Sequence, residues 1–487
     1  MCNSDPVTTQ AELGNASNEP YYGSSSPHAD SDSTSHPARY ASAQSEGLNF
    51  ATHVKDHSVQ MLRVQGGRPL GGRVRISGSK NAGLPALAAS LLTDESVTLH
   101  RVPALNDIRF MVRILEDLGC EISFKAGEAH IRAREIDGDP FPECVRQMRA
   151  SVCLLGPLVA RMKRVSMPLP GGCVIGQRPI DLHLRGLKAL GCEISIQNGL
   201  VSASAGHLKG TTLSMGGPFG STVTGTVNII CAATLAQGTT VIRDAAREPE
   251  VADLCRMLNK MGAKIGGIGE STLTIEGVER LHGVSHELIP DRIEFGTFLL
   301  LALASRSKLE LPKVDPSLCG ALVDVLAANG AEFEETSDFF VVHGNRSNLR
   351  PMCLETLPFP GLPTDLQAPL CALLTQIFGE SSIKENIYPN RFTHIGELQR
   401  MGANISTDGP QAIIRGATQL SGTSVIIPDL RAGACLYLAA LIAKGESLIY
   451  GVHHVDRGYE NFDEKLKQIG AVLQREEVVR ENGCKEI

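Results

Sequence analysis

Leu118-Gly-Cys-Glu-Ile122 and Leu190-Gly-Cys-Glu-Ile194 are two copies of a short pattern that decides the fold. In each copy an amphipathic stretch ends at glycine, and a small residue and a strand-like segment follow. Glycine in this place is the residue that ends a helix with a positive φ. The pattern occurs six times, 72, 71, 68, 72 and 68 residues apart, at Gly119, Gly191, Gly262, Gly330, Gly402 and Gly470. A step this regular is typical of a repeat architecture.

A second type of helix recurs in the same phase and is apolar on nearly every face, which predicts that it is buried. Its copies are expected at residues 84–92, 150–159, 227–235, 295–303, 366–374 and 434–441. Each is followed by a short β-rich segment such as Ser96-Val-Thr-Leu-His100. The sequence therefore predicts an α/β fold: a two-lobed inside-out α/β barrel of six repeats of about 70 residues, three per lobe, with buried helices and outer sheets.

The 487 residues exceed what one hydrophobic core usually supports. We expect residues 80–290 to form the first lobe, and residues 61–79 plus 291–478 to form the second, so that the chain crosses between the lobes twice. The cleft between the lobes is the expected ligand site. Residues 1–60 are polar and lack apolar periodicity, which predicts a disordered N-terminal extension, and residues 479–487 are expected to be a C-terminal tail.

Composition narrows the class of protein. The net charge of −7 argues against a general nucleic-acid binder. The 13 cysteines are scattered, with neither a Cys-x-x-Cys pair nor zinc spacing, so neither a disulfide framework nor a structural metal is predicted. No long apolar run and no signal peptide is evident, which predicts a cytoplasmic protein without membrane insertion.

The stretch Leu169-Pro-Gly-Gly-Cys-Val-Ile-Gly-Gln-Arg-Pro179 is a poor helix and a poor strand, and it predicts a shaped surface loop. It sets the thiol of Cys173 among three glycines, with Arg178 five residues further on. A partly exposed cysteine near positive charge is a candidate for a lowered pKa and for reactivity. The alternative is that Cys173 is one more small packing residue.

Basic residues recur where the predicted buried helices begin. Lys80, in Ser77-Gly-Ser-Lys-Asn-Ala-Gly83, suits an anionic phosphate or carboxylate at a helix N-terminus, although a solvated lysine beside a capped helix is the alternative. The same structural place in other units is expected to carry Arg149, Arg391, Arg431 and Arg457. Together with Arg178, these side chains predict a polyanion site in the cleft, since guanidinium groups match phosphate and carboxylate oxygens.

Asp365, in Leu362-Pro-Thr-Asp-Leu-Gln-Ala368, opens the fifth predicted buried helix. One interpretation is an N-cap aspartate, which is common. The other is a general base that faces the cleft.

Taken in order, several of these motifs resemble those of the enolpyruvyl transferases. The similarity covers residues 61–475 and is carried by Ser77-Gly-Ser-Lys-Asn-Ala82, Met148-Arg-Ala-Ser151, Pro170–Pro179, Ala246-Arg-Glu-Pro-Glu250, Pro363-Thr-Asp365, Asp429-Leu-Arg431 and Asp456-Arg-Gly-Tyr459. The family fold, two inside-out α/β lobes, agrees with the repeat interpretation. The resemblance implies transfer of enolpyruvate from phosphoenolpyruvate to the 3′-hydroxyl of UDP-N-acetylglucosamine, with release of phosphate, as the first committed step of peptidoglycan synthesis.

The resemblance also implies roles for single residues. Phosphoenolpyruvate would contact Lys80, Asn81, Arg178, Arg391, Arg431 and Arg457. The nucleotide sugar would contact Asn81, Arg149, Arg178, Pro179, Ile180, Asp181, Leu182, Asp365 and Ile387. Asp365 would accept the hydroxyl proton and Cys173 would protonate the methylene carbon to form a tetrahedral ketal, with Lys80 assisting. Cys173 would also be alkylated by the epoxide antibiotic fosfomycin. No metal and no cofactor is implied.

Two alternatives stay open. A sister transferase acting on shikimate 3-phosphate would be expected to lack the Cys173 loop and to carry Lys-Ser in place of Lys80-Asn81. A weakly active or non-catalytic paralogue that binds nucleotide sugars is the second. One stretch departs from the family pattern: residues 216–226 are two residues longer than expected, so the uridine-diphosphate contacts expected there stay unassigned.

Overall fold

The structure is a computed structural model that describes residues 58–137, 139, 142–171 and 179–479. Residues 1–57 of the predicted extension and residues 480–487 of the predicted tail lie outside this range. Ser58, Val59 and Gln60, predicted to be disordered, instead belong to a strand that pairs with the segment ending at Val479, so the prediction is wrong for these residues. The described residues form five four-stranded sheets, one three-stranded sheet and a two-stranded hairpin. Two separate clusters of buried apolar side chains organise them. The first core draws on residues from Ala82 to Leu288, and the second core on Leu62 to Ile76 and Ile293 to Leu473.

Around the first core the strand orders are β15-β3-β5-β4, β6-β8-β7 and β13-β14-β12-β9, with the hairpin β10-β11 beside them in the chain. The strands are β3 (Ser96–His100), β4 (Glu121–Lys125), β5 (Glu128–Arg132), β6 (Arg164–Pro168), β7 (Glu193–Gln197), β8 (Leu200–Ser204), β9 (Thr212–Ser214), β10 (Gly216–Gly217), β11 (Gly220–Ser221), β12 (Thr239–Arg243), β13 (Lys264–Gly266), β14 (Thr272–Glu276) and β15 (Val284–Glu287). The helices are α1 (Lys80–Ala89), η1 (Ser90–Leu92), α2 (Asn106–Asp117), α3 (Pro142–Gln147), η2 (Arg149–Leu154), α4 (Leu155–Met162), α5 (Asp181–Ala189), α6 (Val223–Ala233) and α7 (Pro249–Lys260).

Around the second core the strand orders are β23-β24-β1-β25, β17-β18-β16-β2 and β19-β20-β22-β21. The strands are β1 (Ser58–Gln65), β2 (Gly71–Arg73), β16 (Lys308–Pro312), β17 (Phe333–Glu335), β18 (Phe339–His343), β19 (Cys353–Glu355), β20 (Gly379–Lys384), β21 (Asn404–Asp408), β22 (Gln411–Gly416), β23 (Ser424–Ile426), β24 (Glu446–Tyr450) and β25 (Val472–Val479). The helices are α8 (Arg292–Ala304), η3 (Pro316–Cys319), α9 (Gly320–Ala328), η4 (Thr364–Leu366), α10 (Gln367–Leu374), α11 (Ile395–Arg400), α12 (Leu430–Ile442), η5 (Val452–Arg457) and α13 (Phe462–Gln468).

Several helices are buried on every side, as expected for segments that are apolar all round. Every residue of α8 and α10 is buried, as is α12 from Arg431 to Leu441. The helix α2, in contrast, buries only one face. Strands such as β14 alternate exposed and buried residues, so one face of that sheet meets solvent. The described residues therefore form a mixed α/β fold in which apolar helices lie in the interior.

The six pattern glycines share one backbone conformation. Their φ values lie between +97° and +101°, in Gly119, Gly191, Gly262, Gly330, Gly402 and Gly470. L-residues with a side chain rarely adopt this region, which explains why glycine occupies each position.

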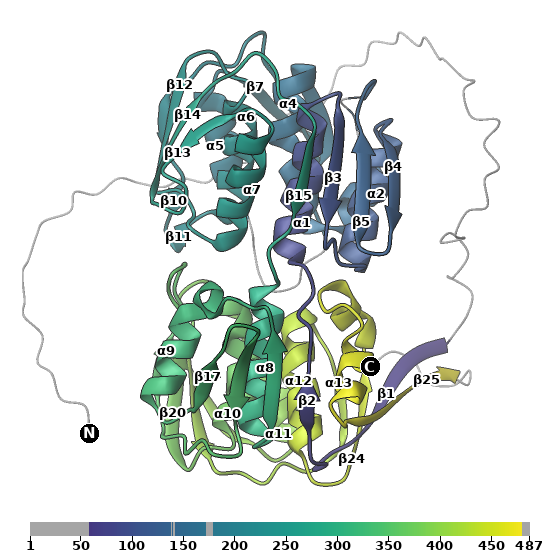
Figure 1. Ribbon diagram of the computed structural model, residues 1–487, viewed down its shortest axis with the longest axis vertical. Helices are drawn as coiled ribbons and strands as arrows, with labels where there is room; N and C mark the ends of the chain where they lie inside the picture. Colours follow the sequence, from purple (N-terminus) through teal and green to yellow (C-terminus); the bar gives the residue numbers. More distant parts are fainter. Residues whose placement is uncertain (1–57, 138, 140–141, 172–178, 480–487) are drawn as a thin grey trace, which may run out of the picture. The chain divides into compact units, whose positions relative to one another are not determined.

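The N-terminal strands belong with elements from the far end of the chain. Strand β1 pairs antiparallel with both β24 and β25, and β2 pairs parallel with β16. In Figure 1 these two purple strands accordingly lie among the green and yellow elements. Where the chain passes between the cores, Ser79 N donates to Ile289 O over 2.8 Å and Asp291 N donates to Ser77 O over 2.9 Å. The two connecting segments therefore run side by side.

No helix within the described ranges has the length and apolar character that crossing a membrane requires.

Candidate active site

Lys80 is the first residue of α1, and its environment begins with the helix cap. The hydroxyl of Ser79 accepts a hydrogen bond from Ala82 N over 3.3 Å, which defines where the helix starts. The side chain of Lys80 is only 11% exposed, and its Nζ lies 3.3 Å from Asp107 Oδ2. Lys80 is therefore a mostly buried, paired cation rather than a solvated one. Asn81 follows it in the first turn and is half-buried.

Asp107 also holds a cation from the second core. It lies in the first turn of α2, and its Oδ1 accepts Arg457 Nε over 2.9 Å. Arg457 is the last residue of η5. One carboxylate thus bridges two of the predicted phosphoenolpyruvate contacts, Lys80 and Arg457.

Asp365 forms a second cluster with two more of the predicted arginines. Its Oδ1 lies 2.8 Å from Arg391 Nη1 and its Oδ2 lies 3.0 Å from Arg431 Nη2. Burial by itself would raise the pKa of Asp365, but Arg431 and Arg391 outweigh it and hold that pKa well below its usual range. Asp365 lies inside η4 and caps no helix, so the N-cap interpretation is wrong.

Arg431 is oriented by its own helix terminus. Asp429 caps α12 by accepting the amides of Arg431 and Ala432, and it also accepts the Thr393 hydroxyl over 2.8 Å. The guanidinium carbon of Arg431 lies 5.5 Å from the centre of the Tyr459 ring. A cation over an aromatic face is stabilised by the ring quadrupole. Asp429 therefore holds the backbone of Arg431, and the ring of Tyr459 contacts its guanidinium group.

The predicted equivalence of the basic positions holds only in part. Lys80, Arg149 and Arg431 open the buried segments α1, η2–α4 and α12. Arg391 and Arg457 instead precede α11 and α13, which are not fully buried helices. The side chain of Arg391 turns toward Asp365 and that of Arg457 toward Asp107, so these two arginines belong to two separate carboxylate clusters.

Arg149 spans the two ends of the predicted cysteine loop. Its guanidinium donates to Pro170 O over 3.3 Å and to Pro179 O over 3.5 Å. Ile180 then leads into α5, which begins with Asp181 and Leu182. Cys173 and Arg178 lie outside the described residues. Ile387, a predicted nucleotide-sugar contact, donates its amide to Glu385 Oε1 over 2.9 Å.

The stretch that departs from the family pattern forms the hairpin β10-β11 and the first turn of α6. A Cβ added at Gly217 would lie 3.0 Å from Leu182 Cδ1, and one at Gly220 would lie 2.5 Å from Pro358 Cγ. The hairpin is therefore packed between a predicted nucleotide-sugar residue and the segment before η4, with Phe219 57% exposed at its tip.

The other cysteines that the structure describes are mostly packing residues, as predicted. Eight of these ten are buried, and Cys353 is exposed. Burial raises the pKa of Cys120, Cys255 and Cys319 to about 12, so these thiols stay protonated at neutral pH.

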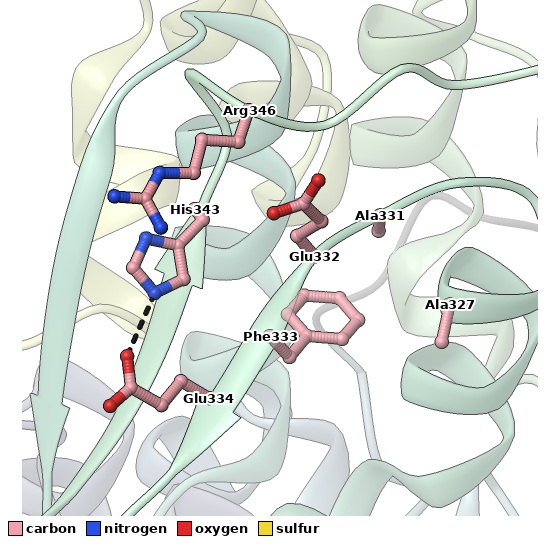
Figure 2. A pocket seen from close by; sticks show the side chains of 7 residues that line it. All are labelled: Ala327, Ala331, Glu332, Phe333, Glu334, His343 and Arg346. Atoms are coloured by element: carbon pink, nitrogen blue, oxygen red, sulfur yellow. Dashed lines mark hydrogen bonds and ion pairs between the residues drawn. The ribbon is translucent and has the colours of Figure 1, made fainter.

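A hollow of about 510 Å³ lies elsewhere, against β17 and β18. Figure 2 shows its lining, in which His343 pairs with Glu334 over 3.0 Å. None of the predicted site residues within the described ranges lines this hollow. Within the described ranges, no group of three or more His, Cys, Asp or Glu side chains could hold a metal ion.

Sequence reasoning missed four residues that organise the site: Asp107, Thr364, Glu385 and Tyr459. Asp107 and Glu385 look like ordinary surface acids in the sequence, although both are buried. Thr364 and Tyr459 did lie within motifs named above, Pro363-Thr-Asp365 and Asp456-Arg-Gly-Tyr459, which was a signal that they lie near Asp365 and Arg457.

Comparison with known proteins finds relatives that match most of the chain. The family model for EPSP synthase (3-phosphoshikimate 1-carboxyvinyltransferase) matches residues 64–466. A UDP-N-acetylglucosamine 1-carboxyvinyltransferase of Akkermansia muciniphila is 48% identical over 422 residues, which cover 86% of this chain and 99% of the relative. One from Methylacidiphilum infernorum is 48% identical over 413 residues, covering 85% and 98%.

Solved structures show the same fold. The enolpyruvyl transferase NikO of Streptomyces tendae superposes with a TM-score of 0.79 at 24% identity, over 86% of this chain and 100% of that one. EPSP synthase of Acinetobacter baumannii superposes with a TM-score of 0.66 at 17% identity, over 86% of this chain and 100% of that one. With these matches over most of its length, the chain belongs to the enolpyruvyl transferase family and, within it, to the UDP-N-acetylglucosamine 1-carboxyvinyltransferases.

Proposed function

We propose that this protein transfers enolpyruvate from phosphoenolpyruvate to the 3′-hydroxyl of UDP-N-acetylglucosamine and releases phosphate. The names of relatives 48% identical to it support this reaction. The observation that carries it is the carboxylate of Asp365 held between Arg391 and Arg431. This arrangement sets a proton acceptor for the attacking hydroxyl beside two guanidinium groups that suit an anionic donor.

The proposed roles follow the chemistry of each group. Lys80, Asn81, Arg178, Arg391, Arg431 and Arg457 hold phosphoenolpyruvate. Asn81, Arg149, Arg178, Pro179, Ile180, Asp181, Leu182, Asp365 and Ile387 contact the nucleotide sugar. Asp365 takes the proton of the attacking hydroxyl, whose oxygen bonds to C2 of phosphoenolpyruvate, while Cys173 gives a proton to C3. Loss of a C3 proton and of phosphate from the resulting ketal then restores the double bond.

The low pKa of Asp365 fits this cycle if the donor rearranges the arginines. Two guanidinium groups on Asp365 disfavour its protonation. A phosphate or carboxylate that draws Arg391 and Arg431 toward itself raises the proton affinity of Asp365 in the bound complex. The base then gains its strength only when the donor is bound, which is where catalysis needs it.

The lobes at residues 80–290 and at 61–79 plus 291–478, and their inside-out arrangement of six repeats, belong to the same proposal. The two separate cores support the lobes, and the six glycines with φ near +98° support the repeat. We further propose that the protein acts in the cytoplasm on small-molecule substrates, in cell-wall synthesis and hence in cell shape and division.

A coupled assay of phosphate release tests the reaction. Phosphoenolpyruvate with UDP-N-acetylglucosamine should give turnover, and phosphoenolpyruvate with shikimate 3-phosphate should not. The second acceptor is included because the matching family model is named for an enzyme that uses it. Turnover with shikimate 3-phosphate alone, or with neither acceptor, would reject the proposal.

A further inference from the structure

Glu385 is a fully buried acid that follows β20 and lies behind the Asp365 cluster. Its carboxylate accepts four hydrogen bonds, from Thr356 Oγ1 over 2.8 Å, Thr364 Oγ1 over 2.9 Å, and the amides of Ile387 and Tyr388 over 2.9 Å each. All four partners are uncharged donors, so this acid is stabilised without a direct ion pair to any of them. A buried carboxylate needs such donors, because burying it without partners would be costly.

The two oxygens of Glu385 do different things. Oε1 accepts from Thr356, Ile387 and Tyr388, and so closes the turn that leads to Arg391. Within that turn Arg391 N donates to Tyr388 O over 2.9 Å. Oε2 accepts from the Thr364 hydroxyl. One oxygen therefore shapes the backbone, and the other orients a hydroxyl group.

That hydroxyl in turn holds Arg391. Because Thr364 gives its proton to Glu385, its oxygen lone pairs face Arg391 Nη1, which donates to it over 3.0 Å. The same Nη1 lies 2.8 Å from Asp365 Oδ1. Arg391 Nε is buried and finds no hydrogen-bond partner among the described residues. The guanidinium is therefore oriented by its Nη1 contacts and by the ring of Tyr388, whose centre lies 5.7 Å from the guanidinium carbon. The result is a chain of contacts from Glu385 through Thr364 and Arg391 to Asp365.

We propose that Glu385 is a positioning residue that acts through the Thr364 hydroxyl to hold Arg391 for the anionic donor and to limit how strongly Arg391 pairs with Asp365. The proposal rests on the proposed function, which supplies the roles of Arg391 and Asp365. A hydroxyl that donates to a buried carboxylate becomes a stronger acceptor, because hydrogen bonds in a chain polarise one another. Thr364 therefore competes with Asp365 for Arg391, and keeps the guanidinium in place when Asp365 takes a proton.

The substitution Glu385→Gln separates the two tasks of the acid. Oε1 faces three donors and Oε2 faces one, so the glutamine carbonyl must occupy the Oε1 site and its amide must face Thr364. The amide then donates to Thr364, whose proton turns away from Glu385 and toward Arg391 or Asp365. The turn at Ile387 stays intact while the contact to Arg391 is weakened, because the Thr364 oxygen now also accepts from the glutamine amide. Glu385→Ala removes both tasks.

The test combines steady-state kinetics with calorimetric binding of inorganic phosphate. Glu385→Gln and Thr364→Val should each raise the KM for phosphoenolpyruvate about tenfold, the effect of one hydrogen bond to a charged group, and should lower kcat. The KM for UDP-N-acetylglucosamine should stay within about twofold for both, and should rise only in Glu385→Ala, since that variant frees Ile387. Thr364→Ser keeps the hydroxyl and should recover most of the loss.

Two comparisons separate positioning from mere stability. The double variant Glu385→Gln, Thr364→Val should be no worse than Thr364→Val, because both substitutions break one chain of contacts. Asp253→Asn removes another buried acid, paired with His286 over 3.1 Å in the first core, and should lower stability without changing the KM for phosphoenolpyruvate.

Additive effects, or a Glu385→Gln variant with wild-type KM and phosphate affinity, would overturn the positioning role. If Glu385→Gln does not fold, the contrast between Thr364→Val and Thr364→Ser decides, and equal values for the two would also overturn it. If the wild-type protein releases no phosphate, the proposed function fails. The affinity for inorganic phosphate in Glu385→Gln against wild type then decides the role of Glu385 by itself, with equal affinities rejecting it.

Discussion

Arg457 Nε donates to Asp107 Oδ1 over 2.9 Å, although the two residues are 350 positions apart in the sequence. Asp107 belongs to α2 beside the first core and Arg457 to η5 beside the second. Because Asp107 also pairs with Lys80, one buried carboxylate neutralises two cations that the proposed function assigns to phosphoenolpyruvate. An incoming phosphate must compete with Asp107 for both.

Replacing Asp107 by asparagine should therefore tighten the binding of inorganic phosphate. The anion no longer competes with a carboxylate, and a gain of about tenfold corresponds to about 1.4 kcal/mol. Turnover should fall, since Lys80 and Arg457 lose the group that positions them. Calorimetry with phosphate measures the first effect. Asp117→Asn, at the end of the same helix, is the matched control, and weaker phosphate binding in Asp107→Asn would contradict the competition.

Replacing Asp365 by asparagine should reduce kcat by about 100-fold or more, the scale of a lost general base. Asparagine keeps the shape of the side chain but cannot accept the hydroxyl proton. Phosphate release measures the effect, and Asp408→Asn, at the exposed end of β21, serves as the control. An unchanged kcat would remove Asp365 from the proton transfer.

Cys173 should be the cysteine whose alkylation abolishes activity. The buried thiols have a raised pKa and react slowly, whereas Cys353 is exposed and should react without loss of turnover. Peptide mapping after brief treatment with iodoacetamide or fosfomycin identifies the modified residues. The variant Cys173→Asp should keep activity and lose sensitivity to fosfomycin, with Cys353→Ser as the control. Full inhibition of Cys173→Asp by fosfomycin would refute the assignment.

His394 should make the protein less stable in mild acid. Burial lowers its pKa from 6.5 to about 4, with Asp429 opposing and Arg391 reinforcing the shift. The unfolded chain therefore binds a proton between pH 6.5 and 4 that the folded chain does not. The free energy of unfolding therefore has its full value above pH 6.5, and it falls by up to about 3 kcal/mol as the pH drops to 4.

Urea unfolding of His394→Gln across this window measures that contribution. In His394→Gln the unfolding free energy should fall less steeply between pH 6.5 and 4 than in wild type. His130→Gln, which replaces a largely exposed histidine, should show the wild-type dependence on pH. Equal slopes in wild type and His394→Gln would show that His394 does not titrate in this way.

Replacing two of the pattern glycines by alanine should lower the free energy of unfolding by different amounts. Gly330 and Gly402 share a φ of +98°, so both substitutions carry the same backbone strain of about 1–2 kcal/mol. A Cβ at Gly330 would lie 2.2 Å from Asn348 O, whereas the nearest atom to one at Gly402 is 3.9 Å away. Gly330→Ala should therefore destabilise the protein more than Gly402→Ala in urea unfolding. Equal losses would mean that Asn348 moves aside freely.

Much of the fold could be predicted because its signals are local. A glycine that must follow a helix with positive φ, or a helix that is apolar on every face, depends on neighbours along the chain. For the same reason the positions of Lys80, Arg431 and Asp365 near helix starts could be predicted, each from a motif of a few residues.

The pairing of these groups was decided only by the tertiary structure. Nothing in the sequence links Asp107 to Arg457, or Glu385 to Thr364, because each contact joins separate elements whose approach depends on how helices and strands pack. Sequence by itself determined which residue types, helix ends and turns the chain carries. Packing alone decided which acids are buried against which cations, since charge pairing inside a protein acts over a few ångströms and is set by geometry rather than by distance along the chain.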